Sequence, residues 1–186
     1  MSSFKPLRYT TAIAISLFAV STANQAQATC SAAGSVGDDT ITCTGVSSDN
    51  LNLSTGTDVL NVGVGDTLDG GTDAAVVKGA GALTITNDGT ITFAADTNFE
   101  ATINSGADTL INNSGVISNT GGGSGSFREA ITISGATTST INNSGTISST
   151  SVVIDLNSGT TATINNSAGG MITSCLLYTS PSPRDA

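Results

Sequence analysis

The stretch Ile141-Asn142-Asn143-Ser144-Gly145-Thr146-Ile147 decides the fold, because similar stretches occur three more times along the chain. Residues 85–91 read ITNDGTI and residues 111–117 read INNSGVI, and both align with it without a gap. Residues 164–172 read INNSAGGMI, with two extra residues. Successive copies begin 26, 30 and 23 residues apart. A period of this size is typical of solenoid proteins, in which each repeat packs only against its neighbours.

Each repeat contains aliphatic and Thr-rich runs that suit very short β-strands, separated by corners of Asn, Ser and Gly. A strand that short is not stable alone, so it must pair with the same strand of the coils on either side. We therefore predict an all-β fold, a right-handed parallel β-helix (β-solenoid) with irregular coils of roughly 23–30 residues. The region from Leu51 to Thr173 should form about five coils, each rising about 4.8 Å.

The repeats also predict the core. The aliphatic residues that begin and end each copy should form two interior columns, with Thr side chains outside. The first column contains Ile85, Ile111, Ile141 and Ile164, and the second contains Ile91, Ile117, Ile147 and Ile172. An aliphatic residue also stands eight positions before each copy, at Val77, Ile103, Ile133 and Leu156. This fixed offset predicts a second strand in register, with length variation confined to one Gly- and Ser-rich loop such as residues 121–126.

The corner sequences Asn-Asn-Ser-Gly and Asn-Asp-Gly favour the left-handed backbone conformation of a sharp bend. Stacked coils would place Asn112, Asn142 and Asn165 over one another, and their side-chain amides are predicted to form a hydrogen-bonded ladder. Thr86 occupies the same place in the first copy. The ladder should therefore begin only in the second copy.

The first 28 residues have the parts of a secretory signal peptide. Lys5 and Arg8 precede an apolar stretch over residues 11–20, and Ala26-Gln27-Ala28 fits the pattern of a cleavage site between Ala28 and Thr29. The apolar stretch is shorter than the roughly 20 residues that a membrane-spanning helix needs. We therefore expect the mature protein to be exported, to the cell surface, the outer membrane or the extracellular space.

Cys30 and Cys43 flank a short loop just after the predicted cleavage site. In an exported protein two such cysteines are expected to form a disulfide, which would cap the first coil. The alternative is two free thiols. Their spacing does not suit a zinc site, and the chain has no His to complete one. Residues 29–50 are thus predicted to be an N-terminal cap, and residues 51–174 the repeat region.

The last residues, 175–186, carry no repeat and contain two prolines. The string from Cys175 to Asp185 looks like the in-frame translation of a transposase sequencing adapter, so we interpret it as non-native and expect it to be disordered. The natural protein would then be truncated here near Ser174. A proline-rich linker is the other interpretation.

Charge and composition exclude several function classes. The formal net charge is −9, and between Thr29 and Ser174 only Lys78 and Arg128 are basic. A phosphate backbone would be repelled, so we expect no nucleic-acid binding. The chain has no His, the commonest general base of hydrolases. We therefore predict that it is not an enzyme, and we expect no cofactor and no metal.

One segment weighs against the last expectation. Gly63-Val64-Gly65-Asp66-Thr67-Leu68-Asp69-Gly70-Gly71 resembles the nonapeptide repeats of calcium-binding β-rolls. Those proteins need several consecutive copies, because adjacent turns share each ion. A single degenerate copy more often marks an acidic Gly-rich turn. Whether calcium binds between Gly63 and Asp73 stays open, and a secreted calcium-dependent module is an alternative function.

With its signal sequence, its Asn-rich corners and its INNSGTI repeats, the chain resembles the passenger region of autotransporters of Gram-negative bacteria over residues 29–173. This resemblance implies a surface-displayed β-helix and an outer-membrane β-barrel encoded beyond the repeat region. It also implies a structural, adhesin-like function, in which the rod binds an unknown surface receptor or associates with itself. A further alternative is the non-catalytic stalk of a β-helical polysaccharide-active protein.

Overall fold

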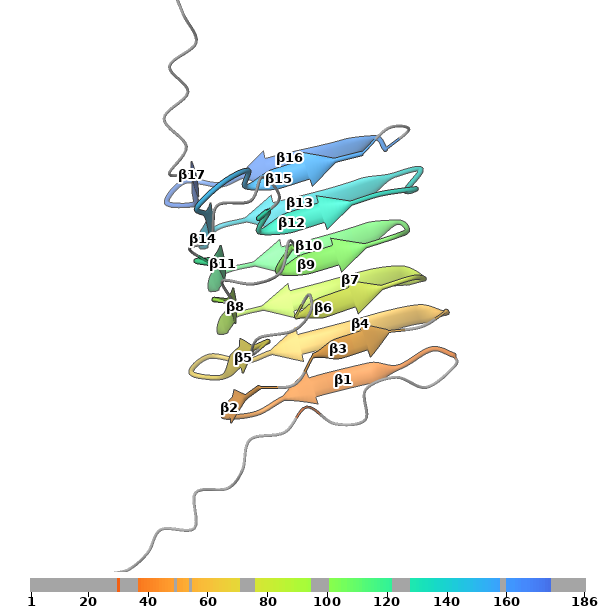
Figure 1. Cartoon of the computed structure of the whole chain (residues 1–186), viewed down its shortest axis with the longest axis horizontal. Coiled ribbons are helices and arrows are strands. Elements are labelled where there is room, and N and C mark those ends of the chain that lie inside the picture. The colour runs from red at the N-terminus through yellow and green to blue at the C-terminus, as the bar shows by residue number, and fades with distance from the viewer. Residues whose placement is uncertain are drawn as a thin grey trace, which may run out of the picture.

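The computed structural model describes residues 30, 37–48, 50–53, 55–70, 76–94, 101–121, 128–157 and 160–174. These residues form a β-solenoid of three parallel sheets, here named A, B and C, through which the chain passes in turn. Strands of successive coils lie one above another along the molecule (Figure 1). The all-β prediction is confirmed. Within the described residues, no helix that would be long and apolar enough to cross a membrane is present.

Sheets A and B have six strands each and sheet C has five. Sheet A contains β1 (Thr40–Cys43), β4 (Thr57–Val62), β7 (Ala82–Asn87), β10 (Thr109–Asn113), β13 (Ser139–Asn143) and β16 (Ala162–Asn166). Sheet B contains β2 (Val46–Ser47), β5 (Thr67–Asp69), β8 (Thr90–Phe93), β11 (Val116–Asn119), β14 (Thr146–Ser149) and β17 (Met171–Ser174). Sheet C contains β3 (Leu51–Leu53), β6 (Val77–Gly79), β9 (Ile103–Ser105), β12 (Ile131–Ile133) and β15 (Ile154–Leu156). The sheets thus begin with β1 and β2, before Leu51 and inside the segment predicted as a cap.

Alternation of buried and more exposed side chains along most strands builds the interior. In β7, for example, Leu83, Ile85 and Asn87 are buried, whereas Thr84 and Thr86 are partly exposed. This is the pattern that β-branched residues produce when one face of a sheet covers a core. Each fully buried Ile contributes about 1.5–3 kcal/mol through the hydrophobic effect.

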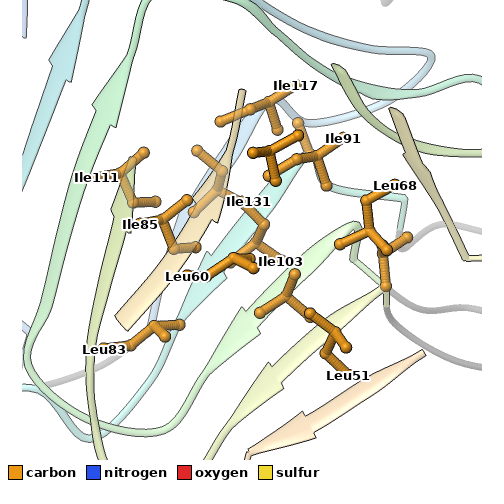
Figure 2. Packing of buried hydrophobic residues seen from close by; sticks show 14 of the residues in the cluster. Leu51, Leu60, Leu68, Leu83, Ile85, Ile91, Ile103, Ile111, Ile117 and Ile131 are labelled. Atoms are coloured by element: carbon orange, nitrogen blue, oxygen red, sulfur yellow. The ribbon is translucent and has the colours of Figure 1, made fainter. Parts of the chain in front are cut away.

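The two predicted interior columns are present. In sheet A, Ile85 pairs with Ile111, Ile111 with Ile141, and Ile141 with Ile164. The column continues below Ile85 through Leu60 and Ile41. In sheet B, Leu68 stands below the column of Ile91, Ile117, Ile147 and Ile172. The side chains of both columns converge on a common interior (Figure 2).

Two of the predicted core residues are not buried. Ile164 is 43% exposed and Ile172 is 38% exposed, whereas Ile141 and Ile147 are fully buried. The register is as predicted, but β16 and β17 are the last described strands of their sheets, so no described coil covers them. Membership of a column is therefore not sufficient for burial.

The register expected from the offset of eight residues holds for two of the three steps in sheet C and is wrong at the step from Ile103 to Ile133. Val77 pairs with Ile103, as predicted, but Ile103 pairs with Ile131 and not with Ile133. Ile133 instead pairs with Ser105 and Leu156. The cause is a longer connection from sheet C to sheet A, residues 134–138 against 106–108 in the preceding coil. A shift of two residues keeps every side chain on its face, so the core tolerates it.

Length variation is therefore not confined to one loop. The connection from sheet B to sheet C also lengthens, from residues 94–102 to residues 120–130. The connection from sheet A to sheet B keeps two residues in three successive coils, at 88–89, 114–115 and 144–145. The corner between sheets A and B is thus the most regular part of the solenoid.

Candidate functional site: asparagine ladders and coil corners

The predicted ladder lies on the outer face of sheet A. The Nδ2 atom of Asn142 donates to Oδ1 of Asn112 at 2.9 Å, and Nδ2 of Asn165 donates to Oδ1 of Asn142 at 2.9 Å. Thr86 pairs with Asn112 in the strand below, so the ladder does begin in the second copy. We call these three residues the outer ladder. Because each amide has two N–H groups and two lone pairs, each rung keeps hydrogen-bonding capacity toward solvent.

A second ladder, which was not predicted from the sequence, runs inside the solenoid one residue further along each strand. The Nδ2 atoms of Asn87, Asn113 and Asn143 each donate to Oδ1 of the next rung at 2.7 Å, the last rung being Asn166. Asn87, Asn113 and Asn143 are almost completely buried. We call these four residues the inner ladder. The signal was present, because the second Asn of each Ile-Asn-Asn triplet alternates onto the same face as the Ile.

The inner ladder also holds the corner between sheets A and B. Nδ2 of Asn143 donates to the carbonyl oxygens of Gly145 and Met171, both at 3.2 Å. Nδ2 of Asn113 contacts the equivalent carbonyls of Gly115 at 3.3 Å and Thr146 at 3.2 Å. Each buried amide thus ties its own corner to the coil above. Such bonds matter, because an unpaired polar group in the core costs about 1–3 kcal/mol.

The corner glycines are needed for a reason other than the predicted one. Among described glycines, those with positive φ are Gly37, Gly45, Gly56, Gly65, Gly135 and Gly169. Gly89, Gly115 and Gly145 of the repeated corner are not in this set, so the left-handed interpretation is wrong there. A Cβ atom on Gly145 would instead collide with the carbonyl oxygen of Gly115, and one on Gly115 with that of Gly89. Close stacking of successive corners excludes any side chain.

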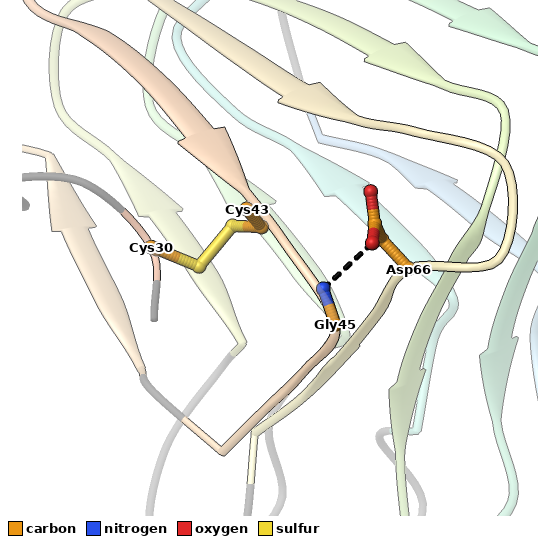
Figure 3. Close-up of a disulfide and its surroundings, with 4 residues drawn as sticks. All are labelled: Cys30, Cys43, Gly45 and Asp66. Carbon is orange, nitrogen blue, oxygen red and sulfur yellow. Dashed lines mark hydrogen bonds between the residues drawn. A yellow bond between two sulfur atoms is a disulfide. The ribbon is translucent and has the colours of Figure 1, made fainter. Parts of the chain in front are cut away.

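At the N-terminal end, Cys30 and Cys43 form a disulfide with an S–S distance of 2.04 Å (Figure 3). Cys43 is the last residue of β1 and is fully buried, and Cys30 forms an antiparallel bridge with it. The crosslink therefore holds Cys30 against the first strand of sheet A. Next to it, Oδ1 of Asp66 accepts a hydrogen bond from the Gly45 amide at 2.6 Å.

Several acidic residues accept hydrogen bonds from backbone amides of the next coil and are not simply solvated turn residues. Oδ1 of Asp38 accepts from the Thr57 amide at 2.8 Å. Oδ1 of Asp108 accepts from the amides of Thr138 at 2.9 Å and Thr137 at 2.7 Å. These amide donors, first that of Thr138, lower the pKa of Asp108. An ionised carboxylate is thus the stable form at the corner between sheets C and A.

The two basic residues of the repeat region occupy different environments. Lys78 is exposed on the outer face of β6, whereas Arg128 is buried just before β12. Glu129 beside Arg128 is also buried, and desolvation raises its pKa, with a smaller contribution from the negative charge of Asp155.

Within the segment that resembles a calcium-binding repeat, residues 63–66 form the turn between β4 and β5, and Thr67–Asp69 form β5. The amide of Asp66 donates to the Gly63 carbonyl at 3.0 Å, while its carboxylate binds Gly45. Within the described residues, no group of three or more His, Cys, Asp or Glu side chains is arranged to hold a metal ion. Residues 71–75, including Asp73, lie outside this part of the chain, as do Ala28, Thr29 and residues 175–186.

No protein-family model matches the chain, and no match was found among curated proteins or solved structures. The assignment of fold therefore rests on the strand pairing and the burial described above.

Proposed function

We propose that this chain is the exported passenger region of an autotransporter, a stiff β-solenoid displayed at the surface of a Gram-negative cell. The observation that carries the proposal is the unbroken interior column from Ile41 to Ile141 in sheet A. Because the coils from Ile41 to Ile141 pack on one another through fully buried side chains, this part of the solenoid is expected to move as one rod. In a rod of this kind the packed core provides stiffness, and the outer faces are available to contact partners.

The disulfide supports the exported location. Disulfides persist in oxidising compartments and are rare in the cytosol. The link between Cys30 and Cys43 closes directly on the first strand, where the parallel sheets would otherwise present an open edge. The signal sequence over residues 1–28 agrees with the same route. The proposed role is structural and adhesive: the rod binds a surface receptor or another rod.

Surface display is tested on intact cells of the source bacterium. Antibodies raised against the repeat region should label intact cells, and external protease should remove that labelling while a cytoplasmic marker survives. Labelling that appears only after the cells are permeabilised would contradict the proposal. A strain in which the gene is deleted provides the matched control for antibody specificity.

A further inference from the structure

The outer face of sheet A is uncharged. Its strands present two full columns of outward side chains, no member of which is buried, and Thr57 and Ala82 form a short third column. The first column is Thr40, Val59, Thr84, Leu110, Thr140 and Thr163, and the second is Thr42, Asn61, Thr86, Asn112, Asn142 and Asn165. This absence of charge extends over all six strands. It is a feature of the whole face and not of one coil.

The other two sheets differ in this respect. Sheet B carries Asp69 on its outer face, and sheet C carries Lys78 and Asp155. The chain as a whole has 14 acidic and 5 basic residues. Because like charges on two approaching copies repel, the uncharged face is the one on which copies can meet at the lowest electrostatic cost.

Charged residues flank this face at its two corners. Asp88 lies at the corner toward sheet B, where it accepts a 2.5 Å hydrogen bond from the Ser114 hydroxyl. Asp38 and Asp108 lie at the opposite corner, bound to amides of the coil above. Protein interfaces commonly have this arrangement, with charge depleted in the centre and polar groups at the rim.

The outer face of sheet A also has two shallow hollows and unused hydrogen-bonding groups. One shallow hollow lies over the outer ladder and the corner serines Ser114 and Ser144, with Asp88 at its rim. A second lies beside Leu110, which is 37% exposed, with Asp108 at its rim. The outer-ladder amides keep unused donor and acceptor capacity, since only part of it is used along the ladder. The surface can therefore both hydrogen-bond and pack.

The spacing of the groups identifies the partner. Neighbouring strands are about 4.8 Å apart, so outward groups of one column recur at that interval along the axis. An extended polymer with another repeat length would lose register after a few coils. A second copy of the same solenoid has the same interval over its whole length, and each additional coil adds an equivalent set of contacts.

We propose that the outer face of sheet A binds the same face of a second copy, with the two solenoid axes side by side. This inference rests on the proposed surface display, because it assigns the self-association to one face of the rod. The strands of sheet A cover roughly 500 Å² per copy, or about 1,000 Å² in a pair. That area is at the lower limit for a specific complex. A single pair is therefore weak, and many rods on two facing cells bind by avidity.

Matched variants of the full chain test the assignment. Thr140→Asp places a charge on sheet A, and Thr146→Asp places the same charge on sheet B of the same coil, at a residue of similar partial exposure. Sedimentation equilibrium, together with clustering of protein-coated beads, measures the association. Thr140→Asp should weaken it at least about tenfold, and Thr146→Asp should change it by less than about twofold. Both variants should keep the wild-type melting temperature.

Two further measurements fix the partner face. A mixture of Thr140→Asp and Thr140→Lys chains should associate more tightly than either variant alone, because the opposed faces then carry opposite charges. Association of the wild type should strengthen as salt screens the two acidic chains. Equal association of Thr140→Asp and wild type, selective loss in Thr146→Asp, or wild-type beads that never cluster would overturn the inference. None of these outcomes affects antibody labelling of intact cells, which tests display alone.

Discussion

Asn87 stands directly above Val62 in sheet A, at the point where the inner ladder ends. Nδ2 of Asn87 donates upward to Asn113, but its Oδ1 atom is buried and accepts no hydrogen bond among the described residues. The upper rungs each receive a donor from the rung below, whereas the Val62 side chain has none to give. The polar column of the inner ladder therefore ends at this pair, and an apolar residue, Val62, takes its place in the coil below.

This asymmetry predicts unequal costs along the inner ladder. Asn113→Val breaks two ladder bonds, leaves Asn143 without its donor and keeps the unsatisfied oxygen of Asn87. Asn87→Val breaks one ladder bond and leaves Asn113 without its donor, but it removes the unsatisfied oxygen of Asn87. Asn113→Val should therefore lower the free energy of unfolding by about 1–3 kcal/mol more than Asn87→Val does. Chemical denaturation of both variants measures the difference. Equal losses would show that the ladder does not act as a connected chain.

How far the sequence predicts the ladders depends on strand alternation. The outer ladder followed from the spacing of the repeats, and so did the two Ile columns. The inner ladder could have been predicted as well, because the alternation that directs Ile141 inward also directs Asn143 inward. The third sheet could not be placed with the same reliability. Its strands have three residues, and the two-residue shift at Ile131 leaves the hydrophobic pattern unchanged.

Glycine at the repeated corner is predicted to be irreplaceable. Gly145→Ala would bring a Cβ atom onto the Gly115 carbonyl oxygen and against the Ser114 carbonyl group, and these backbone atoms of the coil below cannot move aside as a flexible side chain could. Gly106→Ala is the matched control, since its nearest heavy atom, the Gly79 carbonyl oxygen, would lie 3.4 Å away. We expect Gly145→Ala to cost about 2–4 kcal/mol and Gly106→Ala less than about 1 kcal/mol. Thermal unfolding of the two variants measures both costs, and equal costs would contradict the prediction.

The composition alone could not identify this requirement. Asn, Ser and Gly are common both in left-handed turns and in closely stacked corners, so Asn-Ser-Gly fits either explanation. The distance between one corner and the next distinguishes the two explanations. That distance depends on how the coils stack in three dimensions. The same holds for Ile164, whose exposure depends on the coil above it and not on its own repeat.

Alternation also predicts opposite responses at neighbouring positions of β13. Ile141 is fully buried and Thr140 faces outward. Ile141→Asp would place an unpaired carboxylate in the core, at a cost of several kcal/mol, whereas Thr140→Asp should cost less than about 1 kcal/mol. Melting temperatures of the two variants give the comparison. Similar values would mean that the register of the sheet is wrong.

Loss of the disulfide should destabilise the N-terminal coil. The link closes a loop with a sequence separation of 13 residues, and removal of a crosslink of this size typically costs about 2–4 kcal/mol. Cys30→Ala removes it while keeping the buried Cys43 side chain. The variant should unfold at lower denaturant concentration than the oxidised wild type and at about the same concentration as the reduced wild type. A midpoint that reductant does not shift in the wild type would argue against a structural role.

Glu129 is predicted to destabilise the native state at neutral pH. Desolvation raises its pKa, and the charge of Asp155 adds to the effect. The folded chain therefore binds this proton more tightly than the unfolded chain does. Below about 4.5, the ordinary pKa of the group, both states are protonated and the penalty is absent. As pH rises through the native pKa, the folded state is deprotonated at a cost, and stability falls.

Glu129→Gln should consequently raise the free energy of unfolding at pH 7, and the gain should shrink as pH falls toward 4.5. Asp108 provides the control of opposite sign. Its pKa is lowered by the amides of Thr138 and Thr137, so its contribution is present above pH 3.8 and is lost as pH falls through the native pKa. Asp108→Asn should therefore destabilise the protein at pH 7 and have little effect in acid. Denaturation series at several pH values test both signs, and a gain for Glu129→Gln that grows on acidification would refute the assignment of Glu129.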